Sequence, residues 1–241
     1  MIANRLLSLL LPLVVLSACA SPAPYATSIG VLAPGATMHV TMTGGDVRAY
    51  QPIIGGPQNR FTVLATAIDP RMPPAPPKIR PMGTGISITA PQRLRSLLVR
   101  VPKHVNLEVD SQHGNVSVTD IPGNVIVHAG KGNVHIMLSG YAQVALDQGP
   151  ISVTMGSTHW PGVLKFSDGS GDVEVWVPAI ARFHVHLHTD DGTLFTDFPL
   201  RGSSNGSAET IDANVNGGTT RTLDIEVKHG TIRLLSLKPA L

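Results

Sequence analysis

HGNVSV (113–118), PGNVIV (122–127) and KGNVHI (131–136) are three copies of one short unit, and they decide how the chain folds. Their glycines, Gly114, Gly123 and Gly132, lie nine residues apart, and Gly140 and Gly149 continue the series at spacings of eight and nine. A unit of this length accommodates one strand and one turn, so two successive units form one coil of a repeat protein. The sequence therefore predicts short strands that stack coil upon coil.

The strands around these repeats are predicted to bury one face each, because apolar and polar residues alternate from Leu98 onward. The inward positions are Val99, Val101, Val105, Leu107, Val109, Val116, Val118, Val125, Val127, Val134, Ile136, Leu138, Ile151, Val153, Met155, Leu164, Phe166, Val173, Val175, Val177, Phe183, Val185, Leu187, Leu223, Ile225, Val227, Ile232 and Leu234. Units this short cannot bury such a face alone, so stacking must stabilise them. We predict an all-β fold, a parallel β-solenoid with about two strands per coil of roughly 18–21 residues.

Each position of the Gly-Asn-Val unit has a structural explanation. Gly114, Gly123, Gly132 and Gly149 are expected to supply turn dihedrals that other residues reach only with strain. Asn115 and Asn133 lie 18 residues apart, so we expect them at the same corner of successive coils, with stacked amides. The valine that follows would point into the core.

The N-terminus is typical of an export signal. Arg5 precedes an apolar run from Leu6 to Leu16, which is too short for a membrane-spanning helix of about 20 residues. The run ends in Leu16-Ser17-Ala18-Cys19, which resembles the lipobox of bacterial lipoproteins, with an ordinary signal peptide as the alternative. The resemblance implies that residues 1–18 are removed and that Cys19 carries acyl chains, palmitate among them. It further implies a membrane anchor in a bacterial cell envelope and, because Ala20 is not aspartate, the outer membrane.

The mature chain divides into a tether and one domain. Residues 19–35 contain few strong apolar positions and are predicted to form the tether, followed by the domain over 36–237 and a tail at 238–241. Two loops interrupt the domain: residues 69–81 contain six prolines, and residues 201–220, rich in Gly, Ser, Asn and Thr, are expected to be flexible.

Composition and charge exclude several classes of protein. The sequence is 42% apolar and only 14% charged, with 24 glycines and 20 prolines, which favours strands and turns. Without Arg5, 17 basic residues face 16 acidic ones, a formal charge of +1. That balance argues against a nucleic-acid partner or a dedicated anionic-membrane surface. With Cys19 lipidated, no disulfide can form, since it is the one cysteine of the chain.

The motifs, taken together, resemble the putative-adhesin family of bacterial domains of unknown function. The resemblance is carried by the Gly-Asn-Val repeats and by LLVRVPKHVNLEVDSQHGNVSV (97–118), SDGSGDVEVWVP (167–178), HTDDGTLFTDFP (188–199) and VKHGTIRLL (227–235). It implies an adhesin-like β-solenoid over roughly residues 36–237 and supplies no catalytic residues. Fold-level analogy does not establish adhesion.

His184, His186 and His188 alternate with apolar residues, so all three imidazoles should share one outward face. The outer pair would lie about 13 Å apart along an extended strand, so two neighbouring histidines at most could share a metal ion. Asp224 or Glu226 could complete such a site if their strand lies alongside. His128 should lie three strands away and not take part. The alternative is a row of solvated histidines.

Carboxylates offer weaker hypotheses. Glycosidic cleavage needs two carboxylates in one site, but Glu174 and the pair Asp224 and Glu226 are predicted on opposite sheets. The run Asp168-Gly169-Ser170-Gly171-Asp172 is a single approximate copy of a calcium-binding β-roll repeat, and acids beside glycines also stabilise turns. No phosphate-binding loop, Cys-x-x-Cys pair or Gly-x-Ser-x-Gly elbow is present, so we expect no cofactor.

Trp176 and Met137 are predicted to face outward on the same sheet, where an apolar pair marks an interaction surface unless a loop covers it. The sequence thus favours a non-enzymatic envelope lipoprotein with a protein or glycan partner. An envelope polysaccharide-acting enzyme and a metal-binding protein are the alternatives.

Overall fold

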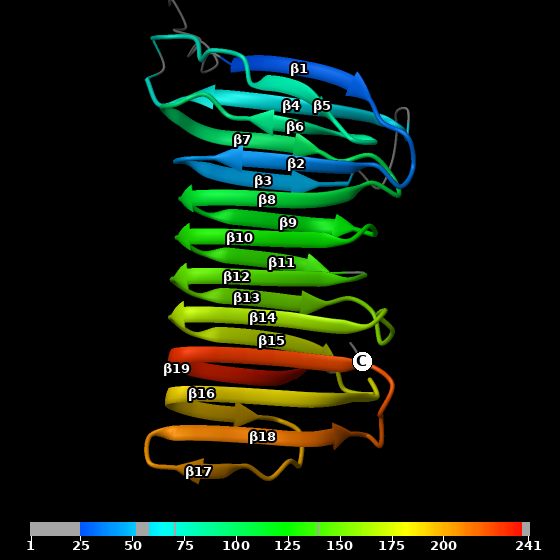
Figure 1. The fold of residues 1–241 in the computed structure, drawn as a ribbon, viewed down its shortest axis with the longest axis vertical. Helices are drawn as coiled ribbons and strands as arrows, with labels where there is room; N and C mark the ends of the chain where they lie inside the picture. Colours follow the sequence, from blue (N-terminus) through cyan, green and yellow to red (C-terminus); the bar gives the residue numbers. More distant parts are fainter. Residues whose placement is uncertain (1–24, 52–57, 70, 139, 238–241) are drawn as a thin grey trace, which may run out of the picture.

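The structure is a computed structural model of the chain, and it describes residues 25–51, 58–69, 71–138 and 140–237. Over these ranges the chain forms 19 strands and no helix, which confirms the all-β prediction. Figure 1 shows the strands stacked in two rows along one long axis, with β1 at one end and β17 at the other. Nowhere in the described ranges is there a helix with the length and hydropathy needed to span a bilayer.

One row of strands, sheet one, begins and ends with antiparallel pairs and is otherwise parallel. In spatial order it contains β5 (Lys78–Met82), β6 (Gly85–Thr89), β2 (Thr37–Met42), β8 (Asn106–His113), β10 (Val125–Lys131), β12 (Ala142–Gln148), β14 (Val163–Ser170), the first part of β19 (Thr222–Leu237), the first part of β16 (Phe183–Thr196), β18 (Ala208–Val215) and β17 (Ser203–Asn205).

The other row, sheet two, has antiparallel pairs at the β1 end alone. Its spatial order is β1 (Tyr25–Val31), β4 (Arg60–Ala67), β7 (Leu94–Arg100), β3 (Asp46–Tyr50), β9 (Val116–Ile121), β11 (Val134–Leu138), β13 (Ile151–Met155), β15 (Val173–Pro178) and the second parts of β19 and β16. The two long strands pair in register through Gly192 and Gly230, so they pass from sheet one into sheet two.

The registers confirm the coil length in the centre of the solenoid. Leu107 pairs with Val125 and Val125 with Ala142, at separations of 18 and 17 residues. The next coil is longer, since Gln143 pairs with Lys165, 22 residues on. The added residues precede β14 and include Trp160, which is buried against Phe183 with ring centroids 5.4 Å apart.

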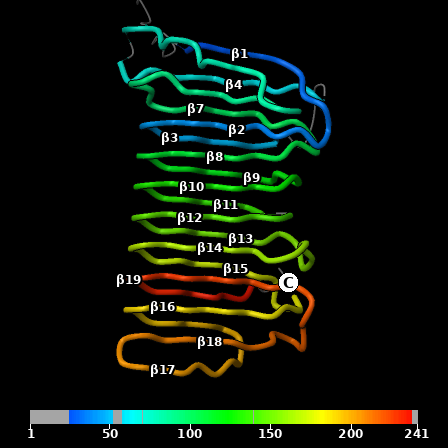
Figure 2. The backbone as a smooth tube through the Cα atoms, in the orientation of Figure 1, coloured from blue at the N-terminus to red at the C-terminus, as the bar shows by residue number. Residues whose placement is uncertain are grey.

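Coils at both ends do not stack in chain order. The coil of β2 and β3 lies between that of β6 and β7 and that of β8 and β9. Likewise β19, the last strand described, lies between the coil of β14 and β15 and strand β16. At one end the chain passes from β2 and β3 out to β4–β7 before it returns to β8. At the other end it passes out through β16, β17 and β18 before β19 returns to pair with β14, as the colours of Figure 2 show.

The core lies between the two sheets, and every residue predicted to point inward from Val99 to Leu234 is buried. Strict alternation fixes the face of each residue once the strand is correctly located, which is why this prediction is confirmed throughout.

The corner residues behave partly as predicted. Gly114, Gly132 and Gly149 have φ of 117°, 143° and 132°, the region that favours glycine, whereas Gly123 does not. At Gly123 the reason is close approach, because a Cβ there would overlap the carbonyl oxygen of Val105. The asparagines do align between coils. Their contact is side chain to backbone, with the Asn133 N–H donating to Asn115 Oδ1 at 3.0 Å, not amide to amide.

Three predicted segments differ from the structure. The tether predicted over 19–35 includes β1, whose inward residues Ala26, Ser28 and Gly30 are too small to give an apolar signal. The loop predicted over 69–81 ends in the edge strand β5, where Pro81 is tolerated. The flexible loop predicted over 201–220 contains β17 and β18, which pair antiparallel beside β16. Residues 1–18, Cys19 and the tail at 238–241 lie outside the described residues.

Candidate functional site

The three histidines of β16 lie on the outer face of sheet one, between β19 and β18. The alternation of β16 buries Phe183, Val185 and Leu187 and turns His184, His186 and His188 outward, as predicted. Asp224 and Glu226 on β19 pair in register with His186 and His188, so their strand does lie alongside β16.

Strand β18, which was expected to be loop, supplies the partners of these histidines. His184 Nδ1 lies 3.0 Å from Asn214 Oδ1, and His186 Nδ1 lies 3.3 Å from Asp212 Oδ2. His188 uses both ring nitrogens, one 2.9 Å from the Thr210 hydroxyl and the other 3.0 Å from Asp190 Oδ1. The imidazoles are therefore held by residues of two strands and are not free donors.

The carboxylates expected to complete a metal site have another partner. Lys165 Nζ, on β14, lies 3.4 Å from Asp224 Oδ2 and 3.3 Å from Glu226 Oε2. The hydrogen bond with Glu226 raises the pKa of Lys165. No three His, Cys, Asp or Glu side chains of the described ranges gather in metal-binding geometry. The arrangement is a network of ion pairs on a surface, with a lysine where a cation would be held.

A second pair of histidines lies toward the other end of the same face. Asp110 on β8 accepts from both sides, with Oδ2 2.6 Å from His39 Nε2 and Oδ1 3.2 Å from His128 Nδ1. His128 is four strand steps from β16, through β12, β14 and β19, where the sequence predicted three. The inserted β19 accounts for the extra step.

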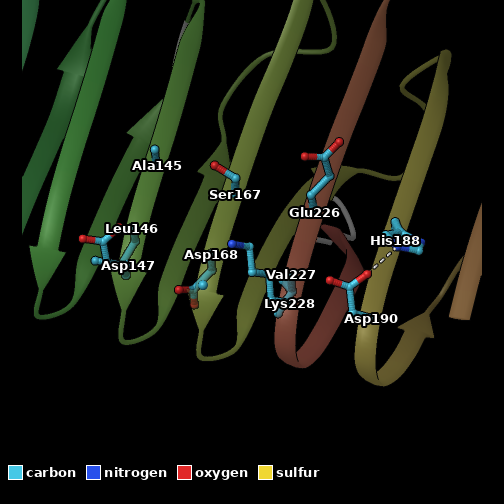
Figure 3. A pocket seen from close by; sticks show the side chains of 11 residues that line it. Ala145, Leu146, Asp147, Ser167, Asp168, His188, Asp190, Glu226, Val227 and Lys228 are labelled. Atoms are coloured by element: carbon cyan, nitrogen blue, oxygen red, sulfur yellow. Dashed lines mark hydrogen bonds and ion pairs between the residues drawn. The ribbon is translucent and has the colours of Figure 1, made fainter. Parts of the chain in front are cut away.

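Between these clusters, the outer face of sheet one has a groove of about 300 Å³ lined by residues of four adjacent strands. Figure 3 shows Asp147 on β12, Ser167 and Asp168 on β14, Glu226 and Lys228 on β19, and His188 with Asp190 on β16. The groove brings several carboxylates together, so their environments decide whether it is an active site.

Asp168 is the enclosed carboxyl of the groove. Burial raises the pKa of its carboxyl to about 6, against a hydrogen bond from the Ser170 N–H that favours the ionised form. The residue is 3% exposed, and its Oδ2 is enclosed with no hydrogen-bond partner. A general acid must reach the substrate oxygen, which this carboxyl cannot do from inside the corner. Glu226 and Asp190 are occupied by Lys165 and His188.

The single calcium-like motif is also used structurally. Asp172 Oδ1 accepts the backbone N–H of Thr231 at 2.9 Å, and Oδ2 lies 3.4 Å from Arg233 Nη1. Asp168 accepts the N–H of Ser170 within its own turn. Both acids therefore accept backbone hydrogen bonds at the corner between β14, β15 and β19, as expected for acids beside glycines.

Trp176 and Met137 lie on the outer face of sheet two, as predicted. The registers place Met137, Thr154, Trp176 and Leu235 side by side on four adjacent strands, and we name these four residues the Trp176 row. Met137 is 41% exposed and Trp176 is half-buried. The indole N–H donates to Glu174 Oε1 at 2.6 Å, which fixes the ring against the sheet.

Glu174 itself points outward on sheet two, whereas Asp224 and Glu226 lie on sheet one.

Residues 107–235, which are more than half of the chain, match the protein family described as Toastrack DUF4097. The chain belongs to this family.

The Toastrack region begins in β8 and ends in β19, so it contains the three histidines of β16, the groove and the Trp176 row. Solved structures similar to the chain include a putative cell adhesion protein from Clostridium sporogenes. It is 14% identical in sequence, the match covers 88% of this chain and 100% of that one, and the TM-score is 0.49. A putative adhesin from Bacteroides fragilis is 9% identical, covering 87% and 96%, with a TM-score of 0.36. No curated protein matches the chain.

Proposed function

We propose that this Toastrack chain is a non-enzymatic, lipid-anchored module of a bacterial cell envelope, and that it binds a protein or glycan partner through the Trp176 row. The observation that carries the proposal is this row of apolar side chains and a threonine hydroxyl on an outer sheet face. Apolar patches on an otherwise polar surface mark interaction sites, and tryptophan combines a large apolar ring with one hydrogen-bond donor.

The neighbouring outward positions extend the surface. Phe195 on β16 is exposed, and the Arg233 guanidinium lies 6.0 Å from its ring centroid. Parallel registers hold these side chains on rigid strands, so little conformational entropy is lost when a partner binds.

The environments of the acids support the non-enzymatic part of the proposal. Glu174 is engaged by Trp176, Glu226 by Lys165 and Asp190 by His188, while Asp168 is enclosed. Outward Glu174 and Glu226 lie on opposite sheets, so they cannot act on one glycosidic bond.

Anchoring rests on Leu16-Ser17-Ala18-Cys19, six residues before the start of β1 at Tyr25. Labelling cells with radioactive palmitate and fractionating their membranes tests it. The wild-type chain should take up label and sediment with the outer membrane, and Cys19→Ser should take up no label. Equal uptake of label by the two chains would refute lipidation of Cys19.

Binding is tested by chemical crosslinking in intact cells with identification of the products by mass spectrometry. The double variant Met137→Ser with Trp176→Ala should lose the crosslinked products of the wild-type chain. The matched control is Val163→Ser, which removes an exposed apolar side chain from sheet one. Products that persist in the double variant, or vanish in the control, would refute a role for the Trp176 row.

A further inference from the structure

The near-neutral charge of the chain conceals an uneven distribution. Residues 25–105 contain nine Lys and Arg but only two Asp and Glu, a formal charge of +7. Residues 106–241 contain eight Lys and Arg and 14 Asp and Glu, a formal charge of −6. The overall balance suggested that no anionic surface is bound. Because the chain folds into a long solenoid, the two halves of this balance are separated in space.

The basic segment forms one end of the solenoid. Strands β1, β4 and β7 of sheet two and β5 and β6 of sheet one lie together beyond β2 and β3 at the end opposite β17, as Figures 1 and 2 show. We name these five strands and their connections the N-terminal end.

The basic side chains of the N-terminal end are available for an external partner. Arg60, Arg71, Lys78, Arg80, Arg93 and Arg95 are all exposed. Asp69 is the acidic residue of this end, and its Oδ1 accepts the backbone N–H of Arg71. None of the six forms an ion pair with any carboxylate in the described ranges.

Large apolar side chains are exposed at the same end. Of the ten large apolar residues that are exposed in the described structure, six lie here: Tyr25, Ile29, Val31, Ile68, Met72 and Met82. Tyr25, Ile29 and Val31 lie on the outer face of β1, while Ile68 and Met72 lie in the connection between β4 and β5. Val31 pairs with Arg60, so apolar and basic side chains are adjacent.

We propose that the N-terminal end docks directly on a bilayer that carries anionic phospholipid headgroups. Exposed apolar side chains enter the headgroup boundary, and each Lys or Arg near an anionic surface adds about 1 kcal/mol, equivalent to about fivefold in partitioning. The acidic remainder is repelled by the same surface, so the solenoid extends away from the membrane and presents the Trp176 row. This docking does not require a lipid on Cys19, although a chain anchored there would begin β1 within about 20 Å of the anchor.

Nucleic acid would also attract the basic residues, but it offers no environment for exposed aliphatic side chains such as Ile68 and Met72. A bilayer surface satisfies both features of the N-terminal end. We therefore make nucleic-acid binding an outcome of the test.

The test measures sedimentation of the chain from Ala20 onward, which keeps every described strand, with vesicles of equal parts phosphatidylglycerol and phosphatidylcholine. The wild-type chain should bind these vesicles, bind pure phosphatidylcholine far less, and bind more weakly, but still measurably, as salt rises. The triple variant Arg71→Gln, Lys78→Gln and Arg80→Gln should lower partitioning by about 100-fold at low salt. The control triple, Lys131→Gln, Arg182→Gln and Arg201→Gln, removes the same charge from exposed positions beyond residue 105 and should not.

The apolar contribution is separated by Ile68→Ser with Met72→Ser, compared with Ile180→Ser, which changes an exposed isoleucine after β15. The first should weaken binding at high salt, where the charges are screened, and the second should leave it unchanged. Absence of binding to anionic vesicles, equal losses from both triple variants, or equally tight binding of a single-stranded oligonucleotide would each overturn the proposal.

Discussion

The buried carboxyl of Asp168 should make the stability of the chain depend on pH in a direction opposite to that of a typical paired carboxylate. Its pKa of about 6 in the folded chain exceeds the ordinary value of 3.8 because burial disfavours the charge. Replacing it with asparagine keeps an acceptor for the Ser170 N–H and removes the ionisation.

The magnitude follows from proton linkage. Between about pH 4 and pH 6 the folded chain binds a proton at Asp168 that the unfolded chain has released, so stability falls as pH rises through this window. The stabilising contribution of the bound proton is fully present below about pH 4 and lost above about pH 6. A shift of about two units corresponds to about 3 kcal/mol.

Urea unfolding of the wild-type chain and Asp168→Asn between pH 3.5 and pH 8 measures this effect. Relative to the wild-type chain, the variant should gain about 3 kcal/mol in the free energy of unfolding between pH 4 and pH 7. Asp147→Asn changes an exposed carboxylate of the same groove and is the matched control, with little change expected. A difference between wild type and Asp168→Asn that does not vary with pH would show that the folded chain binds no extra proton at Asp168.

Two further changes test the scaffold by thermal or urea unfolding. Gly132→Ala should lower the free energy of unfolding by about 1–3 kcal/mol or more, since φ is 143° and a Cβ would overlap the Gly114 carbonyl oxygen. Gly44→Ala is the control, because Gly44 lies in open space without positive φ. Equal losses of stability in the two variants would contradict a special role for Gly132 at the corner. Phe183→Ala should cost about 3–5 kcal/mol because the ring is fully buried, with centroids 5.4 Å from Trp160 and 6.1 Å from Phe198, and a loss under about 1 kcal/mol would contradict this packing.

The body of the fold could be predicted from sequence because its information is local. Alternation within each strand determines which side chains are buried, so Val116, Ile136 and Val175 were correctly placed without knowledge of their neighbours. The spacing of the glycines likewise predicted the number of residues in each coil. Strand β1 was not predicted, because its inward residues are Ala26, Ser28 and Gly30, which give little apolar signal.

The order of the strands along the solenoid could not be predicted in the same way, because it depends on pairing between segments that are distant in sequence. Nothing local to residues 222–237 indicates that they insert beside β14. Two features of the surface depend on this order. Asp212 and Asn214, which contact His186 and His184, lie on β18, a strand whose composition is that of a loop. The separation of charge along the solenoid axis follows only from the positions of the coils.

The most direct test of the central claim, that recognition belongs to the outer face of sheet two, is site-specific photocrosslinking in intact cells. A photoreactive residue is placed in turn at Met137 and Trp176 on sheet two, and at Val163 and His186 on sheet one. We expect a discrete crosslinked partner from the two sheet-two positions and none from sheet one. Crosslinks from sheet one alone, or with equal yield from both faces, would contradict it.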